Sequence, residues 1–297
     1  MHDSLSRRSL ITLAAASASL AVVGRAHAQS TPVATPQAPT LTGLSANEQK
    51  AVAVVESFET GDPTAFEEYV SEAYMQHNLT APNGRQAILD ALPSLAEAGT
   101  TVDVRRAIED GDLVALHTEY TLFGTPTIAF DVYRFEDGLI VEHWDNLQAA
   151  VTDTVSGRSM IDGPTEVTDL DRTEVNKALV RGLVEDVLMG KAPERITNYI
   201  STEGYAQHNP AIADDLEGLT AALEGMAEQD ITMRYDTLHQ VIGEGNFVLA
   251  MSEGEFAGEP TAFYDLFRVE NGKVVEHWDV LQTIPPQTEW QNENGKF

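Results

Sequence analysis

The sequence lacks cysteine and has few basic residues. None of its 297 residues is cysteine, which excludes disulfides, thiolate zinc sites and cysteine nucleophiles. Lysine and arginine number 18 against 47 acidic residues, for a formal net charge of -29 at pH 7. A surface this acidic repels phosphate backbones and anionic lipids, so nucleic acid and membrane surfaces are poor partners.

Long hydrophobic runs are missing as well. The apolar run at residues 10–23 is short of the roughly 20 residues that a membrane span needs. Arg7-Arg8 precedes it, and Ala26-His27-Ala28 follows it as a small-x-small cleavage pattern. These features predict a Tat-type signal peptide and a periplasmic or secreted mature protein; the alternative is an uncleaved membrane anchor.

Common catalytic motifs are absent too. The sequence has no G-x-S-x-G elbow, phosphate-binding loop, dinucleotide fingerprint or H-E-x-x-H motif. His77, His117 and His143 could converge as metal ligands, but the second half has Met251 where the first has His117. Three histidines without close spacing are a weak metal signal, so we predict no metal and no cofactor.

One stretch of the chain occurs twice. Residues 131–148 and 265–282 match at an offset of 134, with 11 of 18 positions identical, and both contain Val-Glu-His-Trp-Asp. A Tyr-x-Gln-His-Asn motif also repeats, at residues 74–78 and 205–209. One module therefore occurs twice. The second copy has three extra residues, which we place near Thr237–Gly245, at the first β-turn.

Composition divides the chain into five parts. They are a signal peptide at 1–28, a flexible linker at 29–44, a first domain at 45–150, a connection at 151–168 and a second domain at 169–297.

Each domain reads as helices followed by strands. In the first, Ser45 and Glu48 form a capping box that opens a helix, and Gly61 ends it. Two more helices are expected, and then the period switches to two. The expected elements are helices at 65–70 and 84–98 and strands at 102–108, 113–122, 127–135 and 139–147. This order predicts an α+β fold whose sheet curls around the helices and leaves a cavity.

The hairpin at 127–147 decides which side chains share a face. With a three-residue loop at 136–138, Asp131 stands opposite His143, and Tyr133 and Asp145 lie on the same face. A two-residue loop would put Trp144 there in place of His143. We favour the three-residue loop because it groups residues able to share protons.

Asp131, His143 and Asp145 could then work as a general acid/base group. An imidazole titrates near neutral pH, and burial can keep an aspartate protonated as a donor. In the alternative, His143 is a hydrogen-bonded core or interface residue, and Glu142 with Arg134 is a surface ion pair. Tryptophans beside these groups are expected to pack or to line a pocket wall.

These motifs resemble the SnoaL-like polyketide cyclase family of the nuclear transport factor 2-like superfamily. The resemblance rests on the two repeats and on Gly-Asp-x-Val-x-x-His at 111–117, and it covers both modules. Residues 284–297 also look like the end of a SnoaL-like subfamily described as candidate aldol-condensation enzymes. Leu79 departs from the family pattern, where proline follows the asparagine.

The resemblance implies two tandem cone-shaped α+β barrels, each with a pocket between sheet and helices. It also implies proton abstraction beside a carbonyl without metal or cofactor, and an internal pseudo-dimer of the two repeats. An exported protein would act on a diffusible small molecule. The alternative is a non-catalytic small-molecule-binding protein of the same fold.

The implied site residues form equivalent sets in the two modules, with the first aspartate of each set as the donor to an enolate. The candidate catalytic residues are His77, Asp131, His143, Asp145, His208, Asp265, His277 and Asp279. The candidate pocket-lining residues are Tyr74, His117, Tyr133, Trp144, Tyr205 and Trp278.

Overall fold

The computed structural model describes residues 41–297. The predicted signal peptide and most of the predicted linker lie outside these residues. Within residues 41–297, no helix is long and apolar enough to cross a membrane.

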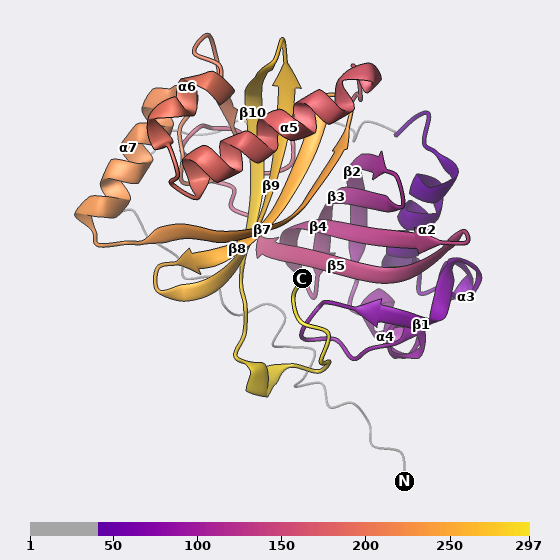
Figure 1. The fold of residues 1–297 in the computed structure, drawn as a ribbon. Helices are drawn as coiled ribbons and strands as arrows, with labels where there is room; N and C mark the ends of the chain where they lie inside the picture. The colour runs from indigo at the N-terminus through magenta and orange to yellow at the C-terminus, as the bar shows by residue number, and fades with distance from the viewer. Residues whose placement is uncertain (1–40) are drawn as a thin grey trace, which may run out of the picture.

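The first module contains three helices and five strands (Figure 1). They are α2 (Ala46–Thr60), α3 (Thr64–Tyr69), β1 (Val70–Gln76), α4 (Arg85–Glu97), β2 (Thr101–Asp110), β3 (Leu113–Leu122), β4 (Thr125–Glu136) and β5 (Leu139–Ala149). The capping box at the start of α2 is confirmed, because the Ser45 hydroxyl accepts from the Glu48 N–H and the Glu48 carboxylate accepts from the Ser45 N–H. Gly61, at φ 71°, ends the helix in the left-handed conformation that glycine adopts most easily.

The second module repeats this order. It contains α5 (Thr173–Leu183), α6 (Ile196–Tyr199), β6 (Ala206–Gln207), α7 (Asp215–Glu228), β7 (Met233–Glu244), β8 (Phe247–Phe256), β9 (Glu259–Glu270) and β10 (Lys273–Thr283). The short helical segments are η2 (Leu170–Arg172), η3 (Val184–Leu188), η4 (Pro193–Arg195) and η5 (Gln287–Glu289).

Each module has a five-stranded mixed sheet, in the orders β1-β5-β4-β3-β2 and β6-β10-β9-β8-β7. The predicted tandem α+β fold is confirmed. The sequence reading missed β1, which pairs in parallel with β5. Only one face of β1 is buried along most of its length, and it directly follows a helix, so its apolar pattern is weak.

The β4–β5 hairpin differs from the predicted register but keeps the predicted face. Glu136 pairs with Leu139, so the loop has two residues and the three-residue loop was wrong. Val141 is then skipped as a bulge, which reverses the alternation once more. Asp131 therefore pairs with Asp145, and His143, which pairs with Tyr133 two positions along, lies on the same face.

We expected the extra residues of the second module at the first β-turn, but they do not lie there. That turn keeps the offset of 134, because Asp110 pairs with Leu113 and Glu244 pairs with Phe247. One extra residue is Asp236, a bulge between two paired positions of β7. The prediction failed because a bulge in a strand leaves no composition signal like that of a turn.

The two sheets meet near the middle of the molecule, with α2–α4 outside one and α5–α7 outside the other (Figure 1). Apolar side chains from both modules form one buried cluster at this junction, which includes Trp144 and Trp278. The Asn146 amide donates to the carbonyls of Ala262 and Val280, at 3.0 and 2.6 Å. Gln148 and Gln282 accept reciprocally, each from a backbone N–H of the other module.

The segments that follow β5 and β10 each cross to the opposite module. The first crossing segment (residues 150–164) packs on the second module, where Trp278 donates to the Asp162 carbonyl. The second crossing segment (residues 284–297) packs on the first, where Asn292 donates to the Asn78 and Ala81 carbonyls. Figure 1 shows the second crossing segment passing from β10 to the neighbourhood of β5.

Candidate functional site

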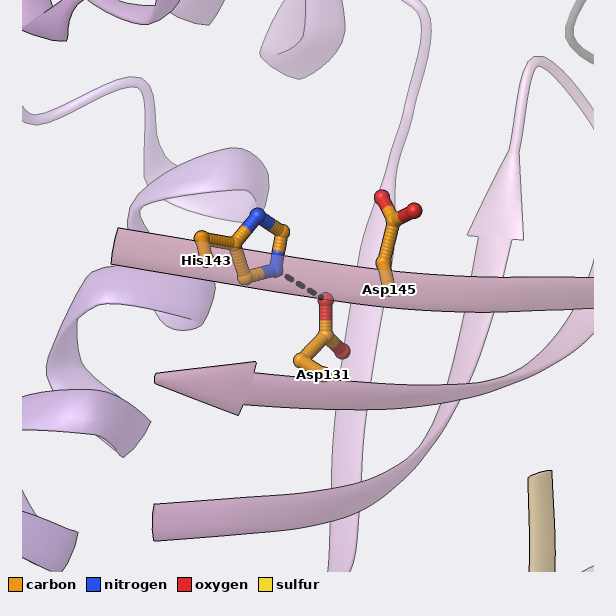
Figure 2. A group of neighbouring side chains, drawn as sticks. All are labelled: Asp131, His143 and Asp145. Atoms are coloured by element: carbon orange, nitrogen blue, oxygen red, sulfur yellow. Dashed lines mark hydrogen bonds and ion pairs between the residues drawn. The ribbon is translucent and has the colours of Figure 1, made fainter. Parts of the chain in front are cut away.

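Each module holds a buried Asp–His–Asp cluster on the helix-facing side of its sheet. In the first it consists of Asp131, His143 and Asp145 (Figure 2), and in the second of Asp265, His277 and Asp279. One ligand atom from each member lies within 4.8 Å of the others. All six side chains are at most 10% exposed.

The pairing of the strands explains why these groups meet. Residues that pair directly across antiparallel strands point to the same face, as do residues two apart. Asp265 pairs with Asp279, and Phe267 pairs with His277. The opposite face carries Trp278, which packs in the junction between the modules. The two-residue loop and its bulge recur here, because Glu270 pairs with Lys273 and Val275 is skipped.

A glutamine fixes the proton on each cluster histidine. Gln207 Oε1 accepts from the Asn209 backbone N–H at 2.9 Å, so this atom is the amide oxygen. His277 Nδ1 lies 3.0 Å from the same oxygen and must therefore donate to it. The Nε2 atom is left to share a proton with Asp265 Oδ1, 3.0 Å away. Gln76 holds His143 in the same way, and the Nε2 atom of His143 lies 3.2 Å from Asp131 Oδ1.

A tyrosine donates to the first aspartate of each cluster, but from different strands. Tyr120 of β3 donates to Asp131 Oδ2 at 2.8 Å. In the second module Gly254 occupies the equivalent position, and Tyr235 pairs with it from β7. Tyr235 donates to Asp265 Oδ1 at 3.2 Å. Because Tyr235 and His277 both use Oδ1, Asp265 Oδ2 is buried without a hydrogen-bond partner in residues 41–297.

The second aspartate of each cluster is held at one oxygen. Asn209 donates to Asp279 Oδ2 at 2.6 Å, while Asp279 Oδ1 has no partner among the described residues. Burial raises the pKa of Asp279 to about 6, and the nearby His277 opposes this. Asp145 accepts likewise from Asn78, but the ammonium of Lys296 lies 3.7 Å from its Oδ1.

The family's sequence pattern, described as the SnoaL-like domain, matches residues 51–143 and 180–277. The chain belongs to the SnoaL-like domain family. The curated proteins contain no match to it. Among solved structures, TsrD from Streptomyces laurentii aligns at 18% identity and a TM-score of 0.31, over 35% of this chain and 88% of TsrD.

Two further solved structures are similar to single SnoaL-like modules. A candidate polyketide cyclase from Bacillus cereus has 19% identity and a TM-score of 0.32, over 35% of this chain and 74% of that protein. An NTF2-like protein of unknown function from Mesorhizobium loti has 23% identity and a TM-score of 0.31, over 35% of this chain and 92% of that protein.

Not every predicted catalytic or pocket-lining residue of this SnoaL-like protein lies in or beside the Asp–His–Asp clusters. His77 and His208 stack on Trp144 and Trp278, on the other face of each sheet. His208 contacts Glu276 at 2.9 Å and Asp162 at 3.1 Å. Burial lowers the pKa of His208, but bonds to these carboxylates outweigh it, so the pKa lies above its usual value.

His117 also lies at the junction between the SnoaL-like modules. Its Nδ1 is 3.0 Å from the Arg106 guanidinium, which lies over the Trp278 ring at 4.2 Å. Burial and the Arg106 charge lower the pKa of His117 well below its usual value. His77, His117 and His143 therefore do not form a common metal site. Of the pocket-lining candidates, Tyr74, Tyr133 and Tyr205 accompany the clusters; His117 and the tryptophans do not.

The Asp–His–Asp clusters are the groups in residues 41–297 whose chemistry could suit a metal ion, through two carboxylates and one imidazole. The Nδ1–H of each histidine is already oriented by glutamine, as is usual for metal-binding histidines. The expectation of no metal stays a prediction.

Two surface clefts lie on the second module and the connection that precedes it. One of about 820 Å³ is lined by Tyr205, Arg158 and Lys273, and one of about 380 Å³ by Asn246 and Glu166. Neither is lined by a member of the Asp–His–Asp clusters, whose side chains are buried. Tyr205 lines the cleft of about 820 Å³, and its hydroxyl accepts from Gln207, which also holds His277.

Several residues that complete the sites were not predicted. The two glutamines and two asparagines stand in the repeated Tyr-x-Gln-His-Asn motif, so their repetition was a usable signal. The two tyrosines gave none, because they occupy different strands. These residues are Gln76, Asn78, Tyr120, Gln207, Asn209 and Tyr235.

Proposed function

We propose that this SnoaL-like protein is a cofactor-free acid/base enzyme that acts on a small carbonyl compound. The observation that carries the proposal is the pair of unpartnered carboxylate oxygens in the second module, Asp265 Oδ2 and Asp279 Oδ1, beside His277. Unpartnered buried acceptors are costly, so proteins keep them mainly where a ligand or a proton completes them.

The two oxygens suit opposite halves of a proton transfer. Asp265, hydrogen-bonded to His277, takes a proton from the carbon beside the carbonyl, which is the reverse of the donor role that the family resemblance implied for it. Asp279, protonated at mildly acidic pH because of its raised pKa, gives its proton to the carbonyl oxygen. The substrate loses one proton from carbon and gains one on oxygen, so the product is the enol. Its carbon can then be reprotonated elsewhere, which isomerises the compound, or can attack a second carbonyl in an aldol condensation.

The first module is less suited to this step. Asp131 uses both oxygens, one toward His143 and one toward Tyr120. The Oδ1 atom of Asp145, which has no hydrogen bond within residues 41–297, faces the ammonium of Lys296 at 3.7 Å. We therefore assign the main reaction to the second module.

The other parts of the proposal concern location and assembly. A Tat-type signal would place the folded protein in the periplasm or outside the cell, where a diffusible small molecule is the accessible substrate. The reciprocal contacts of Gln148 and Gln282 support an internal pseudo-dimer of the two repeats. The acidic surface argues against nucleic acid and membrane partners.

Solvent-deuterium exchange at the α-carbon of small ketones and aldehydes tests the proposal. We expect Asp265→Asn and His277→Ala to abolish exchange. The fall in exchange rate caused by His143→Ala measures how much of the exchange the first module contributes. His239→Ala, outside both clusters, is the control and should retain the full rate. Undiminished exchange in the His143→Ala, His277→Ala double variant would sink the mechanism.

The second candidate function is non-catalytic binding of a small molecule. It is favoured by the burial of both clusters, whose side chains are at most 10% exposed. In that case the same variants would weaken ligand binding in calorimetry, while no carbonyl compound exchanged or turned over.

A further inference from the structure

The two crossing segments reach the opposite module in the same way. His77 Nδ1 lies 2.9 Å from the Gly295 carbonyl, and His208 Nδ1 lies 2.6 Å from the Ser159 carbonyl. The next residue is buried in both segments. It is Lys296, 7% exposed, in one segment, and Met160, 2% exposed, in the other. Equivalent places in the pseudo-symmetric pair thus hold a cation and a neutral side chain.

Lys296 brings its charge to the first cluster. Its Nζ donates to the Asp145 carbonyl at 2.6 Å and to Gln282 Oε1 at 2.8 Å. It also lies 3.7 Å from Asp145 Oδ1, the carboxylate oxygen without a hydrogen bond. Burial lowers the pKa of Lys296, but Asp145 opposes this, and acceptors alone surround the nitrogen. In Figure 2 the Asp145 carboxylate stands beside the His143–Asp131 pair without a bond to it.

Met160 brings no charge to the second cluster. Its sulfur accepts from the Val151 N–H at 3.3 Å, and its side chain packs in the apolar junction. In residues 41–297 no lysine or arginine forms an ion pair with Asp279. Asp279 Oδ1 is therefore a buried acceptor without the cation that its counterpart has.

We propose that the residue at this place, Lys296 for the first module and Met160 for the second, sets the charge of the site aspartate and thereby makes the two sites chemically different. The ammonium 3.7 Å from Asp145 Oδ1 favours a negative charge there over a proton that could be given to a substrate. Without one, Asp279 can hold a proton and give it to a substrate. The chain would thus combine a fixed-anion site and a proton-donor site on one scaffold.

The titratable groups around each aspartate belong to the site as well. Those acting on Asp279 are His277, Asp265, His208, Tyr205 and Tyr235. Those beside Asp145 or affected by it are Asp131, His143, Lys296, Tyr74, Tyr120, Tyr133 and Tyr264. Each set contains the other two members of its Asp–His–Asp cluster and at least two tyrosines, but only the first set contains a lysine ammonium. The difference in cation is therefore the main chemical asymmetry.

The inference rests on the proposed function only for its catalytic consequence, because the charge can be measured without turnover. The experiment is a carbon-13 carboxyl NMR titration of aspartate-labelled protein, with Asp279 assigned through Asp279→Asn. In unmodified protein we expect Asp279 to titrate near pH 6. In Met160→Lys the midpoint should fall by at least one pH unit. Met160→Leu, which is similar in size and neutral, should leave it in place.

The reverse exchange tests the first site. Lys296→Met should make the protein lose stability as the pH rises from 5 to 8, since the Asp145 carboxylate loses its neighbouring ammonium. Lys296→Arg keeps the charge and should restore the original pH profile. An unchanged Asp279 midpoint in folded Met160→Lys would overturn the proposal. If that variant does not fold, identical pH profiles for Lys296→Met and Lys296→Arg would overturn it instead.

Discussion

Asp279→Asn should stabilise the protein at high pH and leave it unchanged at low pH. The raised pKa of Asp279, about 6 against an ordinary 3.8, corresponds to about 3 kcal/mol between its two protonation states. For a carboxyl whose folded pKa is raised, stability is complete below the unfolded value and is lost as the pH rises from about 4 to about 6. An asparagine never ionises, keeps an oxygen for Asn209 and places an NH₂ at the unpartnered position.

Urea unfolding at pH 4 and pH 8 measures the effect as a double difference between variant and unmodified protein. We expect a gain of up to about 3 kcal/mol at pH 8 and almost none at pH 4. Asp145→Asn is the matched control, and it should give no gain at pH 8, because it leaves the buried Lys296 ammonium without its carboxylate. An equal effect of Asp279→Asn at both pH values would refute the reasoning, since it would mean that ionisation of Asp279 costs nothing.

Other contacts give sharper tests of single interactions. Tyr235→Phe removes a buried donor to Asp265 and should cost about 1 kcal/mol in urea unfolding; no loss would mean that the bond is not formed in solution. His208→Gln should cost about 1–3 kcal/mol at pH 6 and less at pH 9, because the charged histidine stabilises below its unfolded pKa and that stability fades as the pH rises through the raised folded value. Arg106→Met leaves the carbonyls of Ile161 and Pro164 without their donor and removes one of the two donors to the Asp162 carbonyl, so it should cost about 3 kcal/mol; an unchanged melting temperature in calorimetry would contradict this.

The repeat and the order of elements were predictable because they are written in identical residues and in long periodic runs. The duplicated hairpin and the capping box of α2 are local features, and both occur where the sequence places them. The fifth strand was missed because β1 is short, partly exposed and pairs with β5, distant in sequence. Pairing partners far apart in the chain leave no local pattern.

The cluster face was predicted for an incomplete reason. The face on which a side chain lies depends on both the loop length and the number of bulges in the hairpin. The loops are one residue shorter than predicted, and the bulges at Val141 and Val275 restore the predicted face. A bulge at a valine has no composition signal, so the right grouping of Asp131 with His143 came with the wrong register. His77 and His208 were assigned to the sites because they share the repeated motif, yet alternation along the chain turns them to the opposite face.

The crossing segments have a consequence for how the chain can be divided. Each module carries, after its last strand, the piece that seals its neighbour, so a cut near residue 168 would yield two fragments that each lack their own seal. Each fragment would expose an apolar sheet face and a histidine that has lost its backbone carbonyl partner, His77 in one and His208 in the other. The halves are thus obligate complements. Mixed in equal amounts they should reassemble into the intact pair, whereas either one alone would aggregate.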